Sequence, residues 1–172
     1  MTERCDFLVI GTGNIAKRHI ANLRRLHKKG VIGCVSSSGR HLTSKDVDVD
    51  VIFEDKSEAR KSSPRMAIIA SPSSFHLQDA EIFLTQDIPV LIEKPITDKL
   101  EDALELKELA SDNIIQVGHV ERFNSAYKKS LEYIDNFLEN YETMIDNNKE
   151  CIIVYFGNNE NNENFRNFLK DK

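Results

Sequence analysis

The chain alternates short apolar runs with amphipathic helical patterns along most of its length, and this alternation constrains its fold more than any other feature. Such an alternation is typical of a parallel sheet whose strands are joined by helices that cover it. The runs that we predict as strands are Phe7–Ile10, Val31–Val35, Val51–Phe53, Met66–Ala70, Val90–Ile92 and Ile114–Val117. The predicted helices are Asn14–Leu26, Phe75–Gln86 and Leu100–Ala110. The fold class that follows is α/β, with a doubly wound parallel sheet.

The apolar positions of each predicted helix indicate which side faces the sheet. In the first helix we expect Ile15, His19, Leu23 and Leu26 on that side, with His19 as a packing residue. In the second and third helices the corresponding positions are Leu77, Ala80, Leu84, Leu100, Ala103, Leu104, Leu106 and Ala110.

The sequence after the last predicted strand has a different character. We place a domain boundary here, with residues 1–122 as the sheet domain and residues 123–172 as a short α/β remnant. The remnant is predicted to contain a long helix, Ser125–Asn147, and one strand, Cys151–Phe156. The asparagine-rich tail beyond Gly157 has few apolar side chains to bury.

Composition excludes several classes of function. The formal net charge is −5, without the clustered Lys and Arg of a nucleic-acid surface, so we expect no nucleic-acid partner. No apolar run approaches the roughly 20 residues of a membrane span, so we expect no membrane partner. Cys5, Cys34 and Cys151 are too far apart for a metal motif, so no metal site is predicted. Free thiols indicate a reducing compartment, and we expect a cytoplasmic location.

A glycine-rich turn joins the first predicted strand to the first helix. Its sequence is Gly11, Thr12, Gly13, Asn14, Ile15 and Ala16. This fits G-x-G-x-x-G/A in the strand–turn–helix context of a dinucleotide-binding Rossmann domain. Gly11 permits the tight turn, Gly13 leaves room for a pyrophosphate, and Ala16 allows close packing of helix on strand. The amide groups and the dipole at the start of the helix then bind the phosphates. The alternative is a glycine turn that binds nothing.

The residues after the second predicted strand bear on the choice of cofactor. NAD-specific sites place Asp or Glu there, to accept hydrogen bonds from the adenosine ribose. This chain instead has small hydroxyl residues, including Ser37, followed by Arg40. An arginine suits the 2′-phosphate of NADP, because a guanidinium forms charge-assisted, paired hydrogen bonds with phosphate. We therefore expect NADP or NAD, with NADP favoured; the alternative is that Arg40 is only a solvated loop residue.

Four motifs occur in order at natural spacing: the Gly11–His19 segment, Ala70-Ser71-Pro72 with His76, Glu93-Lys94-Pro95, and the Val117–Asn124 segment. Together they resemble the Gfo/Idh/MocA oxidoreductase family, and the last motif is most similar to its sugar-nucleotide dehydrogenase branch. The resemblance covers roughly residues 6–127. It implies hydride transfer between a nicotinamide dinucleotide and a hydroxyl of a small sugar-type substrate, namely a sugar, a sugar nucleotide or a polyol.

The resemblance also implies roles for individual residues. Lys94 is then the catalytic residue, partly buried beside nicotinamide and substrate, where it stabilises the developing oxyanion and moves the hydroxyl proton. Residues that would border the cofactor with it are Ser71, Pro72, His76 and Glu93. Residues that would contact substrate are His119, Arg122 and Asn124. Capping for Ser71, packing for His76 and an acidic neighbour for Arg122 are the alternatives.

The sequence departs from the family after Asn124. Family members have a second half with an open sheet, and an aspartate and a histidine there assist the lysine. No residue of this chain matches that pair, and Ser125 replaces a common proline. Two functions therefore stay open: a complete dehydrogenase, or a cofactor-binding fragment or subunit. In the second case helix 125–147 is expected to pair with another copy or with a partner subunit.

Overall fold

The computed structural model describes residues 3–110 and 113–133. These residues fall into two compact units, the first ending at His119 and the second beginning at Val120. The functional boundary expected at residues 122 and 123 stays a prediction. The predicted strand Cys151–Phe156, the polar tail and most of the predicted long helix lie outside the described residues.

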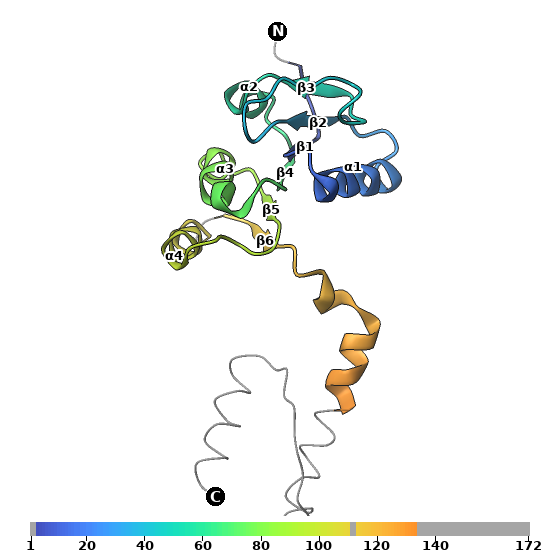
Figure 1. Cartoon of the computed structure of the whole chain (residues 1–172), viewed down its shortest axis with the longest axis vertical. Coiled ribbons are helices and arrows are strands. Elements are labelled where there is room, and N and C mark those ends of the chain that lie inside the picture. Colours follow the sequence, from blue (N-terminus) through green and yellow to red (C-terminus); the bar gives the residue numbers. More distant parts are fainter. Residues whose placement is uncertain (1–2, 111–112, 134–172) are drawn as a thin grey trace, which may run out of the picture. The chain divides into compact units, whose positions relative to one another are not determined.

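The first unit is built on a six-stranded sheet with the order β3-β2-β1-β4-β5-β6 (Figure 1). Its strands are β1 Phe7–Ile10, β2 Ile32–Val35, β3 Val51–Phe53, β4 Met66–Ile69, β5 Val90–Ile92 and β6 Ile115–Val117. Every neighbouring pair is parallel, which confirms the predicted doubly wound sheet. Ile10 pairs with both Val35 and Ile69, so β1, β2 and β4 end at the same level. Successive strands are added on one side of β1 up to β3 and on its other side from β4 onward, and ligands bind at this reversal of strand order in open α/β sheets.

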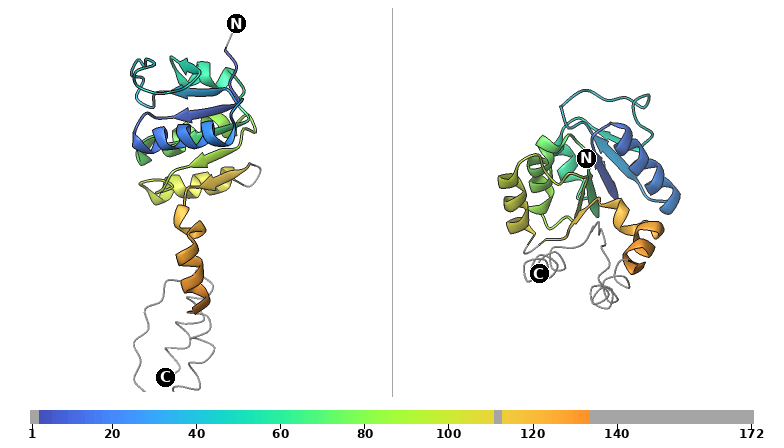
Figure 2. Two further views of the ribbon diagram at one scale, coloured as in Figure 1. Left: turned by 90° about the vertical axis from the view of Figure 1, so that its right-hand side faces the viewer. Right: turned by 60° about the horizontal axis from the view of Figure 1, so that its bottom comes forward.

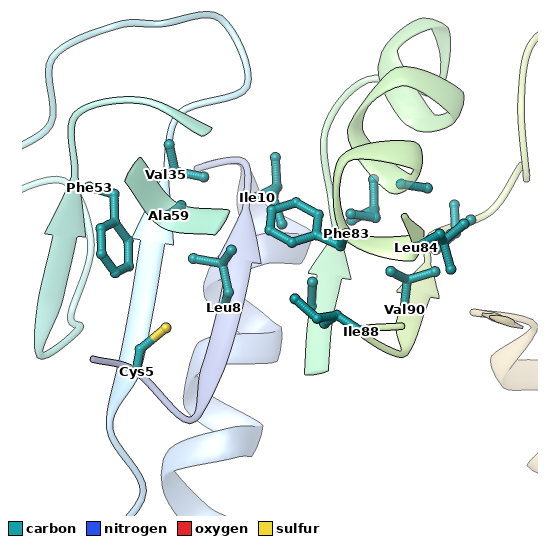
Figure 3. Close-up of a cluster of buried hydrophobic side chains, with 14 of the residues drawn as sticks. Cys5, Leu8, Ile10, Val35, Phe53, Ala59, Phe83, Leu84, Ile88 and Val90 are labelled. Atoms are coloured by element: carbon teal, nitrogen blue, oxygen red, sulfur yellow. The ribbon is translucent and has the colours of Figure 1, made fainter. Parts of the chain in front are cut away.

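Helices cover the two faces of the sheet unequally. They are α1 Asn14–Leu26, α2 Lys56–Lys61, α3 His76–Leu84 and α4 Leu100–Leu109, with a short 3₁₀ turn at Ser73–Phe75. Figure 1 and the right-hand view of Figure 2 show α1 on one face and the other helices on the opposite face. The core between the sheet and α2, α3 and α4 includes Leu8, Ile10 and Phe83 (Figure 3). Phe83 is fully buried, and burial of such a side chain contributes about 3 kcal/mol.

The predicted apolar side of α1 is confirmed at Ile15 and Leu23 and is wrong at Leu26. The helix buries Ala16, Ile20 and Leu23, whereas Leu26 is 68% exposed. Ala16 has no exposed surface, so its small side chain lets α1 approach the sheet closely. His19 is half-buried on this helix, but its side chain contacts a carboxylate rather than the apolar core, so its role differs from the predicted one.

The predicted apolar side of α4 is also wrong in part. Leu106 is almost fully buried, but Leu100 and Leu104 are 70% and 52% exposed. In α3, Ala80 and Leu84 are buried as expected, while Phe83 was not predicted. The helix begins at His76 because the preceding residues form the 3₁₀ turn.

Helix α2 was not predicted. Its sequence is polar and offers no apolar stripe, but Asp55 caps it by accepting a hydrogen bond from the Glu58 amide at 2.7 Å. The Glu58 side chain accepts in turn from the Glu54 amide at 3.0 Å. An acidic cap followed three residues later by Glu is a local signal for a helix start.

The described part of the second unit consists of a 3₁₀ turn, Val120–Phe123, and a helix over residues 125–133. Asn124 caps this helix, because its Oδ1 accepts from the Ala126 amide at 2.9 Å. None of the described helices is long and apolar enough to cross a membrane.

Candidate functional site

The turn after β1 requires glycine at its first position. Gly11 has φ +111°, and a Cβ there would stand 2.4 Å from the Ala70 carbonyl oxygen. Its amide donates to the Val35 carbonyl at 2.9 Å, which holds the turn against the end of β2. The buried Cys34 thiol of β2 donates to the Gly11 carbonyl at 3.5 Å. Burial raises the pKa of Cys34 to about 12, so this thiol is a neutral packing group.

The start of α1 is open. Gly13 is the N-cap residue, it supplies no side-chain cap, and no acid lies in the first turn. A Cβ on Gly13 would meet nothing within 4 Å. The first helical hydrogen bond is Lys17 to the Gly13 carbonyl, so the preceding amides are left for another acceptor. Thr12 and Ile15 are half-buried and Asn14 is exposed around this opening.

The loop after β4 contributes an unpaired hydroxyl. Ser71 Oγ is buried and has no hydrogen-bond partner among the described residues. Pro72, which follows, is exposed. The capping alternative for Ser71 is not observed, because neither the 3₁₀ turn nor α3 has a side-chain cap. The Ala70 and Ser71 backbone packs against Gly11, so Ser71 places an unpaired hydroxyl next to the glycine turn.

His76 joins two loops at this edge of the sheet. Its ring is 1% exposed, and Nε2 lies 2.8 Å from the Ser71 carbonyl oxygen. Nδ1 lies 3.0 Å from the carbonyl oxygens of both Pro95 and Ile96. Both ring nitrogens therefore face protein carbonyls, which differs from the expected direct contact with a cofactor. His76 fixes the β4 loop against the β5 loop.

Glu93, directly after β5, is a buried carboxylate held by two elements. Its Oε1 lies 2.7 Å from Nε2 of His19 on α1, and its Oε2 accepts from the Lys94 amide at 3.2 Å. A Cβ on Gly118, directly after β6, would stand 3.2 Å from this carboxyl group. His19 was predicted to be a packing residue, and the structure corrects this to a hydrogen-bonding position against a buried carboxyl group. No local pattern marks it, because 74 residues separate the two partners.

Lys94 extends from the same loop. Its side chain is exposed rather than partly buried as expected, and it precedes a cis peptide bond to Pro95. No acidic side chain within residues 3–110 or 113–133 lies within ion-pair distance of Lys94 Nζ. The ammonium group is therefore available to a ligand at the carboxyl ends of the strands.

The loop after β2 forms a compact turn. Ser36 Oγ accepts from the Arg40 amide at 3.2 Å, and Ser37 is half-buried beside it. The Arg40 Nη1 lies 2.9 Å from Oδ1 of Asp46. The Arg40 guanidinium, together with hydrogen bonds from Thr43, lowers the pKa of Asp46 to about 2. Sequence reasoning identified Arg40 but missed its acidic partner.

The predicted substrate residues are divided between the two units. His119 ends the first unit and is exposed. Arg122 and Asn124 belong to the second unit, and both are exposed. Asn124 is a helix cap whose amide group also donates to Glu121 at 2.8 Å. The acidic partner considered for Arg122 is not found among the described residues.

Comparison with known proteins agrees with this geometry. Residues 5–119 match the Gfo/Idh/MocA oxidoreductase family, in its NAD-binding Rossmann fold. The chain belongs to this family, which confirms the resemblance carried by the four motifs. Inositol 2-dehydrogenase from Arthrobacter sp. (strain FB24) is 31% identical over 134 residues, which cover 74% of this chain and 40% of that protein. The chain thus spans about 40% of the length of the curated relatives it matches.

Solved structures show the same fold. Scyllo-inositol dehydrogenase from Lactobacillus casei, with bound NAD(H) and scyllo-inositol, has a TM-score of 0.65 at 23% identity. The alignment covers 78% of this chain and 42% of that one. UDP-N-acetylglucosamine 3-dehydrogenase from Acidithiobacillus ferrooxidans has a TM-score of 0.62 at 20% identity, covering 76% and 44%.

Proposed function

We propose that this chain binds a nicotinamide dinucleotide at the carboxyl ends of β1, β4 and β5. We propose further that it acts as an NAD(P)-dependent oxidoreductase. The open, uncapped start of α1 at Gly13 carries the proposal. A pyrophosphate fits there, because free amides and the positive end of the helix dipole favour an anion. Membership of an NAD-binding family supports the same assignment.

The residues around this turn would complete the cofactor site. Thr12, Asn14 and Ile15 border the phosphates in this proposal. Ser71 fits as a second contact, because its buried Oγ has no partner in the described structure and would gain one from the cofactor. Pro72 would line the same loop. His76 acts indirectly by holding the Ser71 loop to the loop that carries Lys94.

Of the two cofactors, we favour NADP. No acid occurs in residues 36–40, where an NAD site needs one to accept from the adenosine ribose. Ser37 and Arg40 lie at that position and suit a 2′-phosphate. The cofactor, when bound, supplies hydride transfer at its nicotinamide.

For the chemistry we assign Lys94 as the residue that hydrogen-bonds the substrate oxygen: its ammonium form would donate a proton to that oxygen during reduction, and its neutral amine form would accept the hydroxyl proton during oxidation. The ammonium group is exposed at the loop after β5, and Glu93 anchors the backbone of that loop. The substrate class that we propose is a polyol, a sugar or a sugar nucleotide. The relatives named as inositol and UDP-N-acetylglucosamine dehydrogenases support this class. His119, Arg122 and Asn124 stay candidates for substrate contact.

A second candidate function is a cofactor-binding part that works with another polypeptide or a further copy. Two exposed aromatic side chains of the second unit favour it, since Phe123 and Tyr133 are 71% and 66% exposed. The 125–147 segment would then meet the partner. We also propose a cytoplasmic location, which the buried free thiols of Cys5 and Cys34 support.

Substitution of Lys94 tests the assigned chemistry. Turnover of myo-inositol, scyllo-inositol and UDP-N-acetylglucosamine would be followed by nicotinamide absorbance in the wild type and in Lys94→Ala. We expect Lys94→Ala to abolish turnover and to leave cofactor affinity unchanged, since the proposed phosphate contacts are made by the start of α1 and not by this side chain. Lys99→Ala, another exposed lysine in the segment before α4, is the matched control. Unchanged turnover in Lys94→Ala, or lost cofactor binding, would reject the assigned role.

A further inference from the structure

The loop after β2 places a carboxylate beside the arginine that the proposed cofactor site needs. The Arg40 backbone is fixed, because its amide donates to Ser36 Oγ and the preceding Gly39 turns the chain with φ +74°. Arg40 therefore extends from the loop at the carboxyl end of β2, where dinucleotide sites of this fold bind the adenosine ribose.

The acidic partner is held in place rather than freely mobile. Asp46 Oδ2 accepts from both the amide and the hydroxyl of Thr43, each at 2.9 Å. Its Oδ1 faces Arg40 Nη1 at 2.9 Å. The carboxylate is ionised at ordinary pH, and these contacts fix its negative charge next to the guanidinium.

This arrangement affects the two cofactors differently. A 2′-phosphate carries close to two negative charges and needs the Arg40 donors, so Asp46 both repels it and competes for the guanidinium. NAD has a neutral hydroxyl at the same position, which a carboxylate does not repel. Because the Asp46 oxygens already bind Arg40 and Thr43, we expect removal of the charge to leave NAD affinity almost unchanged. The charge of Asp46 should therefore lower the affinity for NADPH relative to the affinity for NADH.

We propose that Asp46 is a specificity-determining residue, whose carboxylate restrains Arg40 and limits the preference for NADPH over NADH. This inference rests on the proposed cofactor function. Removal of the charge should release the guanidinium and strengthen NADPH binding by about fivefold, as expected for an exposed ion pair plus a repulsion. NADH affinity should stay the same.

A surface hollow that includes Asp46 in its lining provides a control residue. Between α1 and the loop before β3 it is lined by several cations and by two acids. Its charged residues are Lys17, Arg24, Arg25, Lys45, Asp46 and Asp48. Asp48 is exposed and makes no hydrogen bond or ion pair to Arg40, whose acidic partner is Asp46. Asp48→Asn thus changes the net charge as Asp46→Asn does, without touching the pair.

The experiment measures dissociation constants for NADPH and NADH by calorimetry in the wild type, Asp46→Asn, Asp48→Asn and Arg40→Gln/Asp46→Asn. Melting curves check that each variant folds. The inference predicts a higher NADPH-to-NADH affinity ratio in Asp46→Asn alone, a gain that shrinks at high salt and disappears in the double variant.

The outcomes are distinguishable. Both cofactors binding with an unchanged ratio in Asp46→Asn would overturn the inference and leave the proposed function standing. An equal change in Asp48→Asn would overturn it too, because the effect would then be one of net charge. No binding of either cofactor to any variant would reject the proposed function, and the inference would fall with it.

Discussion

His19 Nε2 lies 2.7 Å from Glu93 Oε1, and this contact joins helix α1 to the loop that carries Lys94. Both side chains are largely buried, with 18% and 7% of their surfaces exposed. The pair therefore ties the proposed cofactor-binding turn to the proposed catalytic loop across the position where the strand order reverses.

Removal of the imidazole should destabilise the folded protein, because it leaves the buried Glu93 carboxyl group without its side-chain partner. We expect His19→Ala to lower the free energy of unfolding by about 2 kcal/mol. His19→Gln retains an N–H donor and should lose less. The double variant His19→Ala/Glu93→Gln should lose less than the sum of the single variants. Urea unfolding of the set measures this coupling, and strictly additive losses would show that the two side chains do not interact.

The two glycines of the turn should respond in opposite ways. Gly11→Ala places a Cβ 2.4 Å from the Ala70 oxygen at φ +111°, so we expect a loss of at least about 2 kcal/mol in stability. Gly13 has φ −70° and open space around its Cα, so Gly13→Ala should change stability by less than about 1 kcal/mol. Thermal melts compare the two variants. A destabilised Gly13→Ala would contradict the open start of α1.

The Arg40–Asp46 pair should contribute to stability only above acid pH. The pKa of Asp46 is lowered from 3.8 to about 2, so the folded state favours the ionised form. The contribution is complete above the unfolded value near 3.8 and is lost as the pH falls toward 2. The difference in melting temperature between wild type and Asp46→Asn should therefore shrink as the pH falls from about 4 to about 2. A difference that stays constant would mean that the carboxylate is not ionised preferentially in the folded state.

Two leucines of α4 test the corrected packing of that helix. Leu106 is 1% exposed and belongs to the core, so Leu106→Ala should lower stability by about 3 kcal/mol. Leu100 is 70% exposed, and Leu100→Ala should change it by about 0.5 kcal/mol or less. Chemical denaturation of both variants decides between the observed packing and the predicted stripe.

The strands and the glycine turn were predictable from sequence because their signals are local. Buried parallel strands are continuous apolar runs, and Phe7–Ile10, Val51–Phe53 and Val90–Ile92 were predicted with the observed bounds. The bounds of α1 were also exact. The buried side of α1 was predicted only in part. Ala16 and Ile20 match a helical period as well as Ile15 and His19 do, so periodicity alone does not choose between these neighbouring stripes.

The missed features depend on contacts between distant parts of the chain. The pairing of His19 with Glu93 follows from how α1 lies over the sheet, and no local pattern encodes it. The family resemblance implied a cofactor contact for His76, but its ring nitrogens face carbonyl groups of the loops after β4 and β5. Only α2 carried a local signal that was overlooked, the Asp55 cap with Glu58.

Cofactor titration tests the central claim most directly. The purified chain and Gly13→Ala would be titrated with NADPH and NADH, following nicotinamide fluorescence and the shift in melting temperature. The account predicts saturable binding to the wild type, with NADPH favoured, and at least tenfold weaker binding to a folded Gly13→Ala variant, because its methyl group occupies the phosphate position. No binding by the wild type, or equal binding by the two proteins, would contradict the claim that the open start of α1 holds the dinucleotide.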